Sequence, residues 1–104
     1  MIKSEAVERL PERYKKDIEK AVEILKNRGC AEVYLFGSLV EGNYTDTADI
    51  DLAVRGLEDR LYFRTWAEVD RGINRNIDLI DLDDEKIDTK VQFILQEREL
   101  VRVG

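Results

Sequence analysis

Hydrophobic residues recur every three to four positions in three segments of the chain, which predicts three amphipathic helices. The first helix runs from about residue 11 to 28 and ends at Gly29, a residue suited to the turn that follows a helix. The second spans residues 58–72, and the third is expected to begin at Asp83 or Asp84, either of which can cap a helix. The inward positions of the third helix are Ile87, Val91, Ile94 and Leu95.

Strand patterns occupy the segments between these helices. Residues 32–36 form an apolar, β-branched and aromatic run, and residues 49–54 and 77–82 alternate between polar and apolar side chains. Residues 38–42 are expected to form one short helical turn, and residues 100–103 a short edge strand. Three to four strands among helices predict a small α/β fold.

The length and composition limit what the chain can be. With 104 residues it has room for one core, so residues 1–104 are expected to form a single domain. One cysteine and no histidine exclude an internal disulfide and leave a poor set of zinc ligands, whereas hard cations held by oxygen remain available. No apolar run approaches the roughly 20 residues that cross a bilayer, and no secretory signal is evident. We therefore expect a cytoplasmic protein without membrane association.

The formal net charge is −6. Because proteins grip nucleic acid largely through Lys and Arg that displace counterions from phosphates, we expect no direct nucleic-acid binding. The same charge suits a basic partner protein, and it equally suits an ordinary soluble surface.

Three aspartates near strand starts are candidates for cation binding. Asp49 and Asp51 lie two residues apart, so their side chains point to one face of the strand at 49–54. Two carboxylates this close repel each other unless a cation neutralises them. On the strand at 77–82, Asp78 is an acid on a face that is otherwise apolar and that it shares with Ile80. Alternatively, the first two acids lie on a solvated edge and Asp78 bonds to nearby backbone.

Gly37-Ser38 follows an apolar strand and precedes the short helical turn. A glycine there lets phosphate oxygens approach backbone N–H groups, and the serine hydroxyl adds a donor. Alone, the pair is also typical of an ordinary turn. The combination with the acids is more informative, because Gly-Ser is followed after ten residues by Asp-Ile-Asp-Leu and then by a third acid on a later strand.

This combination resembles the DNA polymerase β superfamily, and within it the minimal nucleotidyltransferases that are paired with HEPN-type toxins. The resemblance covers essentially the whole chain. It rests on Phe36-Gly37-Ser38, Leu39-Val40-Glu41-Gly42, Ala48-Asp49-Ile50-Asp51-Leu52-Ala53-Val54 and Ile77-Asp78-Leu79-Ile80. It implies the polymerase β-like fold, a small mixed sheet of three to four strands flanked by helices.

The resemblance also implies roles for these residues. Gly37 and Ser38 would bind the β and γ phosphates of ATP. Asp49 and Asp51 would hold two Mg²⁺ ions, while Asp78 would ligate the catalytic ion and help to deprotonate the attacking hydroxyl. The implied activity is transfer of AMP from ATP to a tyrosine of a cognate HEPN toxin, so the chain would be a protein adenylyltransferase and an antitoxin, in a hetero-oligomer with its partner.

Two positions depart from the family pattern. Many relatives carry Arg or Lys before the second glycine and Ser before the first acid, whereas this chain has Glu41 and Ala48. Loss of a cation there would weaken triphosphate binding unless Arg55, Arg75 or Lys90 compensates. Glu41 therefore favours the alternative hypothesis, an acidic antitoxin that neutralises a basic toxin by binding alone; the intact acids and Gly-Ser favour the enzyme.

Three further features are expected to have structural roles. Tyr62 and Trp66 are expected to pack in the core against the sheet. Cys30 is expected to be a buried small residue. Asp81, Asp83 and Asp84 resemble the acidic cluster of a helix N-terminus more than a second metal site.

Overall fold

The structure is a computed structural model that describes residues 4–84 and 89–104. Each main segment predicted as a helix or strand is present; the start predicted for the third helix borders residues outside the described part of the chain, and that helix is described from Thr89 onward. The helices, two of which are single turns, and the short 3-10 turns are α1 (Glu5–Glu8), α2 (Glu12–Asn27), α3 (Ser38–Glu41), η1 (Asp59–Leu61), α4 (Tyr62–Gly72), η2 (Leu82–Asp84) and α5 (Thr89–Glu97). The strands are β1 (Glu32–Phe36), β2 (Ile50–Arg55), β3 (Ile77–Asp81) and β4 (Val101–Arg102).

The four strands form one mixed sheet in the order β3-β2-β1-β4. β1 pairs antiparallel with both β2 and β4, whereas β2 and β3 run parallel. The parallel pair is joined through α4, the crossover that such a connection requires. The mixed sheet flanked by helices confirms the predicted fold class.

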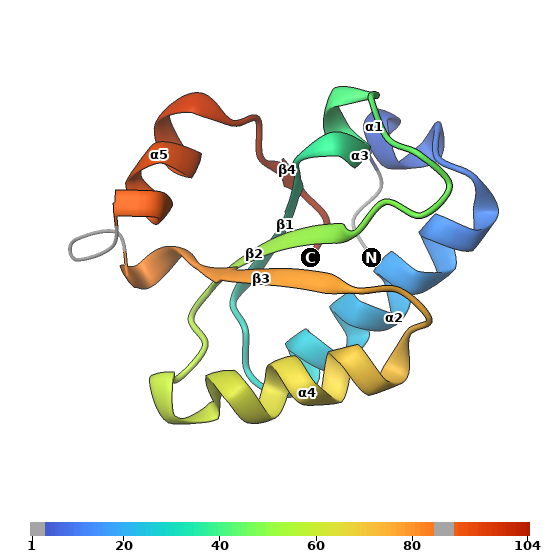
Figure 1. The fold of residues 1–104 in the computed structure, drawn as a ribbon. Coiled ribbons are helices and arrows are strands. Elements are labelled where there is room, and N and C mark those ends of the chain that lie inside the picture. The colour runs from blue at the N-terminus through green and yellow to red at the C-terminus, as the bar shows by residue number, and fades with distance from the viewer. Residues whose placement is uncertain (1–3, 85–88) are drawn as a thin grey trace.

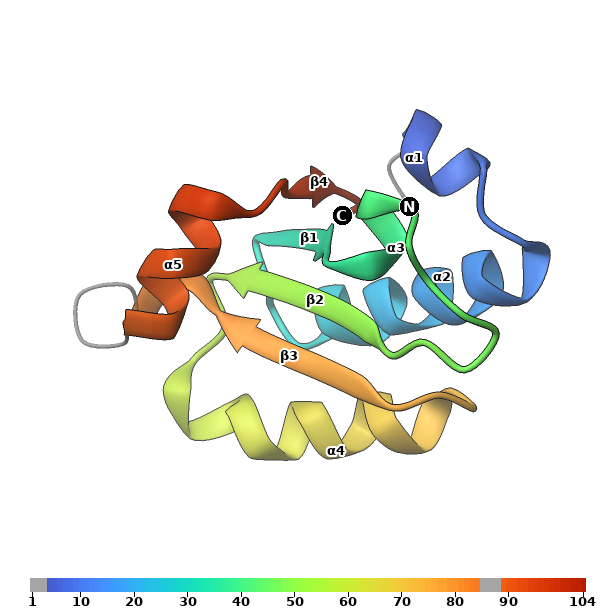
Figure 2. The ribbon, with the colours of Figure 1, turned by 45° about the horizontal axis from the view of Figure 1, so that its top comes forward.

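The two faces of the sheet are covered differently. α2 and α4 contact each other and lie together against one face (Figure 1). Alternate strand residues point to this side and form the main core, including Val33, Leu35, Ile50, Leu52, Val54 and Leu79. α5 lies on the other side of the sheet (Figure 2), where Val91 and Ile94 pack in a smaller apolar cluster with Phe36, Ala53 and Ile80. This second face also carries the side chains of Asp51 and Asp78, because they alternate with the core residues.

The structure bears on several expectations about single residues. Trp66 is 37% exposed and lies at the surface, whereas Tyr62 packs against the main core as expected. Asp83 lies in η2, where its carboxylate accepts a hydrogen bond from the Gly56 N–H at 2.8 Å, and its expected role as a helix cap falls on residues outside the described part of the chain. Ile87 lies outside the described residues. Cys30 is buried as expected, and its burial raises the pKa of the thiol to about 11.

No helix in the described part of the chain is both long and apolar enough to span a bilayer.

Candidate active site

The register of the parallel strands brings two of the predicted acids together. Asp51 on β2 is the direct partner of Asp78 on β3. Directly paired residues of neighbouring strands project to the same face of a sheet, so both carboxylates emerge on the face that α5 shares. Asp49 lies one residue before β2 and is exposed. The sheet therefore holds the half-buried Asp51 and Asp78, and Asp49 lies just before the start of β2.

The end of β1 brings Gly37 to the same place. Phe36 is the Cα partner of Asp51, so the next residue, Gly37, lies beside the Asp51 side chain. A Cβ atom on Gly37 would lie 2.1 Å from Asp51 Oδ2, and the φ angle of Gly37 is +76°. Both the contact and the backbone angle require glycine. α3 begins at Ser38, so the Gly37-Ser38 turn and the paired acids lie side by side, as predicted.

The acids repel one another. Burial, then the charge of Asp78 and then that of Asp49, raise the pKa of Asp51 to about 6, and the charges of Arg98 and Lys90 partly offset this rise. Asp78 and Asp49 therefore both lie within electrostatic reach of Asp51. A bound cation would remove the repulsion, so this set of oxygen donors fits a divalent metal.

Two cations of the C-terminal segment flank these acids. Lys90 Nζ lies 3.7 Å from Asp78 Oδ2, and Arg98 Nη2 lies 2.8 Å from Glu41 Oε2 on α3. Sequence reasoning named Lys90 but missed Arg98. The available signal was their spacing, since Arg98 follows Lys90 by two helical turns and so lies on the same helix face.

The other two candidate cations are engaged elsewhere. Arg55 pairs with Asp83 at 3.4 Å. Arg75 lines a cavity of about 250 Å³ together with Asp49, but its guanidinium pairs with Asp17 at 3.3 Å and stacks over the Tyr14 ring, 3.8 Å from its centroid. Arg75 is therefore mainly a structural residue at the edge of the site.

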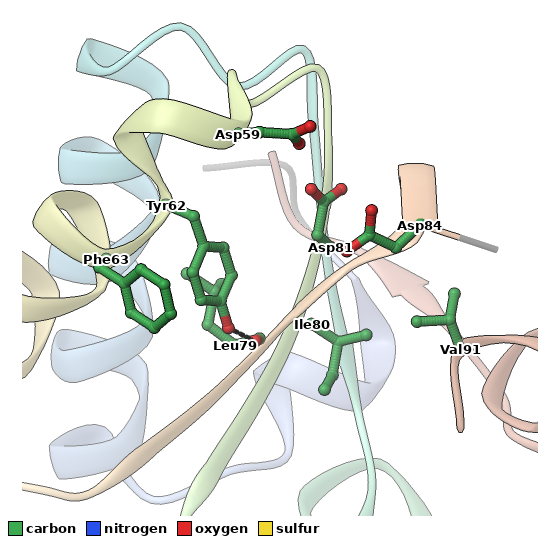
Figure 3. Close-up of a pocket in the computed structure, with 8 residues that line it drawn as sticks. All are labelled: Asp59, Tyr62, Phe63, Leu79, Ile80, Asp81, Asp84 and Val91. Atoms are coloured by element: carbon green, nitrogen blue, oxygen red, sulfur yellow. Dashed lines mark hydrogen bonds between the residues drawn. The ribbon is translucent and has the colours of Figure 1, made fainter. Parts of the chain in front are cut away.

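A second acidic cluster lies at the other end of β3. Among the described residues, the one set of three acids whose oxygens all approach within 4.8 Å of one another is Asp59, Asp81 and Asp84. They line a cavity of about 370 Å³ whose walls include Tyr62, Phe63, Leu79, Ile80 and Val91 (Figure 3). This set shares Asp81 and Asp84 with the acidic run expected at a helix N-terminus, and it adds Asp59.

The contacts of this second cluster are structural. Asp81 is 7% exposed, and its carboxylate accepts a hydrogen bond from the Asp83 N–H at 2.9 Å. Burial raises the pKa of Asp81, so the carboxylate is held in its charged form less readily than usual. The Tyr62 hydroxyl donates to the Leu79 carbonyl rather than to the acids (Figure 3). These hydrogen bonds tie the turn after β3 and the start of α4 to the sheet.

The fold and the paired acids define a domain of the nucleotidyltransferase class. Residues 19–102 match the family model described as Polymerase beta, Nucleotidyltransferase. Because the match spans well over half of the chain, the chain belongs to this family. No match was found among the curated proteins.

Solved structures with the same fold include two toxin–antitoxin complexes. One is described as a toxin–antitoxin with AMP-PNP and has 23% sequence identity and a TM-score of 0.61, covering 79% of this chain and 69% of that chain. The other is described as the toxin–antitoxin MntA-HepT and has 20% identity and a TM-score of 0.57, covering 83% of this chain and 69% of that chain. At these identities the likeness shows a shared fold.

Proposed function

We propose that this chain is a Mg²⁺-dependent nucleotidyltransferase that moves AMP from ATP to a tyrosine hydroxyl of a cognate HEPN-type toxin, and so acts as an antitoxin. In this proposal residues 1–104 are a single catalytic domain, which works in a hetero-oligomer with its toxin in the cytoplasm.

The observation that carries the proposal is the juxtaposition of Asp51, Asp78 and Gly37. The paired register of β2 and β3 and the close approach of Gly37 to Asp51 put two acids beside a Gly-Ser turn. In an ordinary surface turn there is no need for a glycine that packs against a carboxylate. Here Gly37 packs against Asp51, and two other acids, Asp78 and Asp49, repel the same carboxylate. A site for a metal-bound polyphosphate accounts for all three features.

The side chains of the site have distinct proposed roles. Gly37 leaves its backbone open to phosphate oxygens, and the Ser38 hydroxyl donates a hydrogen bond to one of them. Asp49, Asp51 and Asp78 would hold two Mg²⁺ ions, which supply charge neutralisation and alignment of the reacting groups when bound. Asp78 also accepts the proton of the acceptor hydroxyl. The acceptor oxygen then bonds to the α-phosphorus as the bond to the β-phosphate breaks, and pyrophosphate leaves.

The choice of substrate and partner draws on the structures with the same fold. One is described with AMP-PNP, an analogue of ATP, and several are described as MntA–HepT toxin–antitoxin complexes. One of those is a variant in which a tyrosine is replaced by alanine. Another replaces two aspartates, two positions apart, by glutamate, the spacing of Asp49 and Asp51 here. These descriptions single out a tyrosine and a pair of aspartates in such complexes, and we propose the corresponding roles of acceptor, on the toxin, and of working acids, on this chain.

A transfer assay tests the proposal. The full chain is incubated with Mg²⁺, ATP labelled at the α-phosphate, and the proposed HEPN-type toxin partner. We expect label on the partner, and its loss in Asp51→Asn and Asp78→Asn. Asp59→Asn is the matched control, since Asp59 is an acid of the second cluster and should leave transfer intact. If the partner is neutralised while all label stays free, the chain is instead a non-catalytic acidic antitoxin.

A further inference from the structure

The Arg98 guanidinium, which pairs with Glu41 of α3, has a hydrogen-bond donor without a partner. One end nitrogen lies 2.8 Å from Glu41 Oε2, while Nε is buried and has no hydrogen-bond partner. A buried donor without a partner costs free energy, and arginine recognises phosphate through a fork of several donors. The guanidinium therefore has donor capacity that Glu41 does not use.

α5 and the residue after it place this group over the face of the sheet that carries the acids. The Arg98 N–H donates to the Ile94 carbonyl, so the helical path continues to Arg98. Lys90, Ile94 and Arg98 follow one another at intervals of four residues and so share one helix face. Ile94 is buried in the cluster on the Asp51 face, so α5 carries a cation toward the site from each end.

Arg98 also contacts the short helix that follows the Gly-Ser turn. Its partner Glu41 ends α3, the short helix that begins at Ser38. The ion pair thus ties the guanidinium to the short helix that follows the Gly-Ser turn, the turn where the phosphates of a nucleotide would be bound.

The pair with Glu41 is weak enough to exchange. The side chains of Arg98 and Glu41 are 35% and 42% exposed. An ion pair with this exposure contributes about 0 to 1 kcal/mol, whereas a guanidinium on a phosphate forms paired, charge-assisted hydrogen bonds. A triphosphate would therefore displace Glu41 from Arg98.

We propose that Arg98 is a triphosphate-binding residue of this chain and that Glu41 holds its guanidinium beside the Gly-Ser turn until the nucleotide takes its place. The inference rests on the proposed function. It names the source of the cation that position 41 lacks, and it makes Glu41 the partner of Arg98 that competes with the nucleotide.

Opposite effects of two substitutions test this proposal. Binding of ATP, ADP and AMP to the full chain is measured by calorimetry in Mg²⁺ for the wild type, Arg98→Ala and Glu41→Ala. We expect Arg98→Ala to weaken ATP binding by about tenfold or more, and AMP binding by less than about twofold. We expect Glu41→Ala to strengthen ATP binding by about two- to threefold, because it removes a competing carboxylate and a negative charge near the phosphates. Arg98→Lys should restore ATP binding in part.

A matched control separates this role from general charge effects. Arg55→Ala removes a cation of similar exposure that pairs with Asp83 away from the site, and it should leave ATP affinity unchanged. If the Arg98–Glu41 pair only joins α3 to the C-terminal segment, Arg98→Ala and Glu41→Ala will weaken ATP binding and lower the melting temperature equally, which overturns the proposal. Unchanged ATP binding by Arg98→Ala overturns it as well. Absence of ATP binding by the wild type overturns the proposed function itself.

Discussion

Two acidic clusters lie at opposite ends of β3. The cluster at its start contains Asp78 together with Asp49 and Asp51, and the cluster at its end contains Asp59, Asp81 and Asp84. The second is the tighter of the two, since its oxygens all lie within 4.8 Å of one another. Yet, among the residues that the structure describes, it is the first cluster that has a Gly-Ser turn packed against an acid, with Lys90 beside Asp78 and Arg98 paired to the neighbouring Glu41. A short distance between carboxylates therefore indicates a nucleotide and metal site less strongly than the groups around the carboxylates do.

The largest expected effect separates the two clusters by activity. Asp51→Asn and Asp78→Asn are each expected to slow AMP transfer on the order of a hundredfold or more, because each removes charge that holds the reacting groups. Asp59→Asn and Asp81→Asn should change the rate by less than about threefold, since their contacts stabilise turns rather than a substrate. Initial rates of label transfer measure both. Equal losses of transfer rate in the variants of both clusters would show that the second cluster also takes part in the reaction.

A smaller effect tests the contact between Gly37 and Asp51. Gly37→Ala is expected to lower the free energy of unfolding by about 3 kcal/mol, since it combines a positive φ angle with a clash. Gly42→Ala is the matched control, because Gly42 has a φ angle of +86° but nothing within 4 Å of an added Cβ, and should cost about 1 kcal/mol. Urea unfolding of the two variants measures the difference. Equal costs would show that Asp51 does not press against Gly37.

The pKa of Asp51 predicts a dependence of stability on pH. Because the pKa is raised from 3.8 to about 6 in the folded chain, this group favours folding below about pH 3.8, and that contribution is lost as the pH rises through about 6. Asp51→Asn should therefore raise the free energy of unfolding at pH 8 by about 1 to 2 kcal/mol, with no gain near pH 3.

Urea unfolding at the two pH values, repeated with Mg²⁺, checks this prediction. Mg²⁺ should stabilise the wild type at pH 8 but not the variant, because bound Mg²⁺ offsets the same repulsion. A variant less stable than the wild type at pH 8 without Mg²⁺ would contradict the assigned repulsion.

The smallest effect concerns the second cluster. Tyr62→Phe removes the hydrogen bond to the Leu79 carbonyl and is expected to lower the free energy of unfolding by about 1 kcal/mol. ATP binding should not change. Thermal melting and calorimetry measure the two quantities, and a loss of ATP affinity would show that the cavity at the end of β3 takes part in nucleotide binding.

Much of the fold could be predicted from local patterns. The period of hydrophobic residues locates α2, α4 and the strands, because burial of one face imposes that period on any sequence. The expectation for Trp66 failed for a related reason, since a helix period shows which residues share a face but not how far that face is covered.

By itself, the sequence determined the elements, the spacing of Asp49 and Asp51, and the Gly37-Ser38 turn, because these depend on neighbours along the chain. Only the tertiary structure decided that Asp51 pairs with Asp78, that Asp51 presses on Gly37, and that Arg98 meets Glu41. These contacts join residues from different strands and helices. Their geometry depends on strand register and helix placement, which packing of the whole core sets and no local pattern encodes.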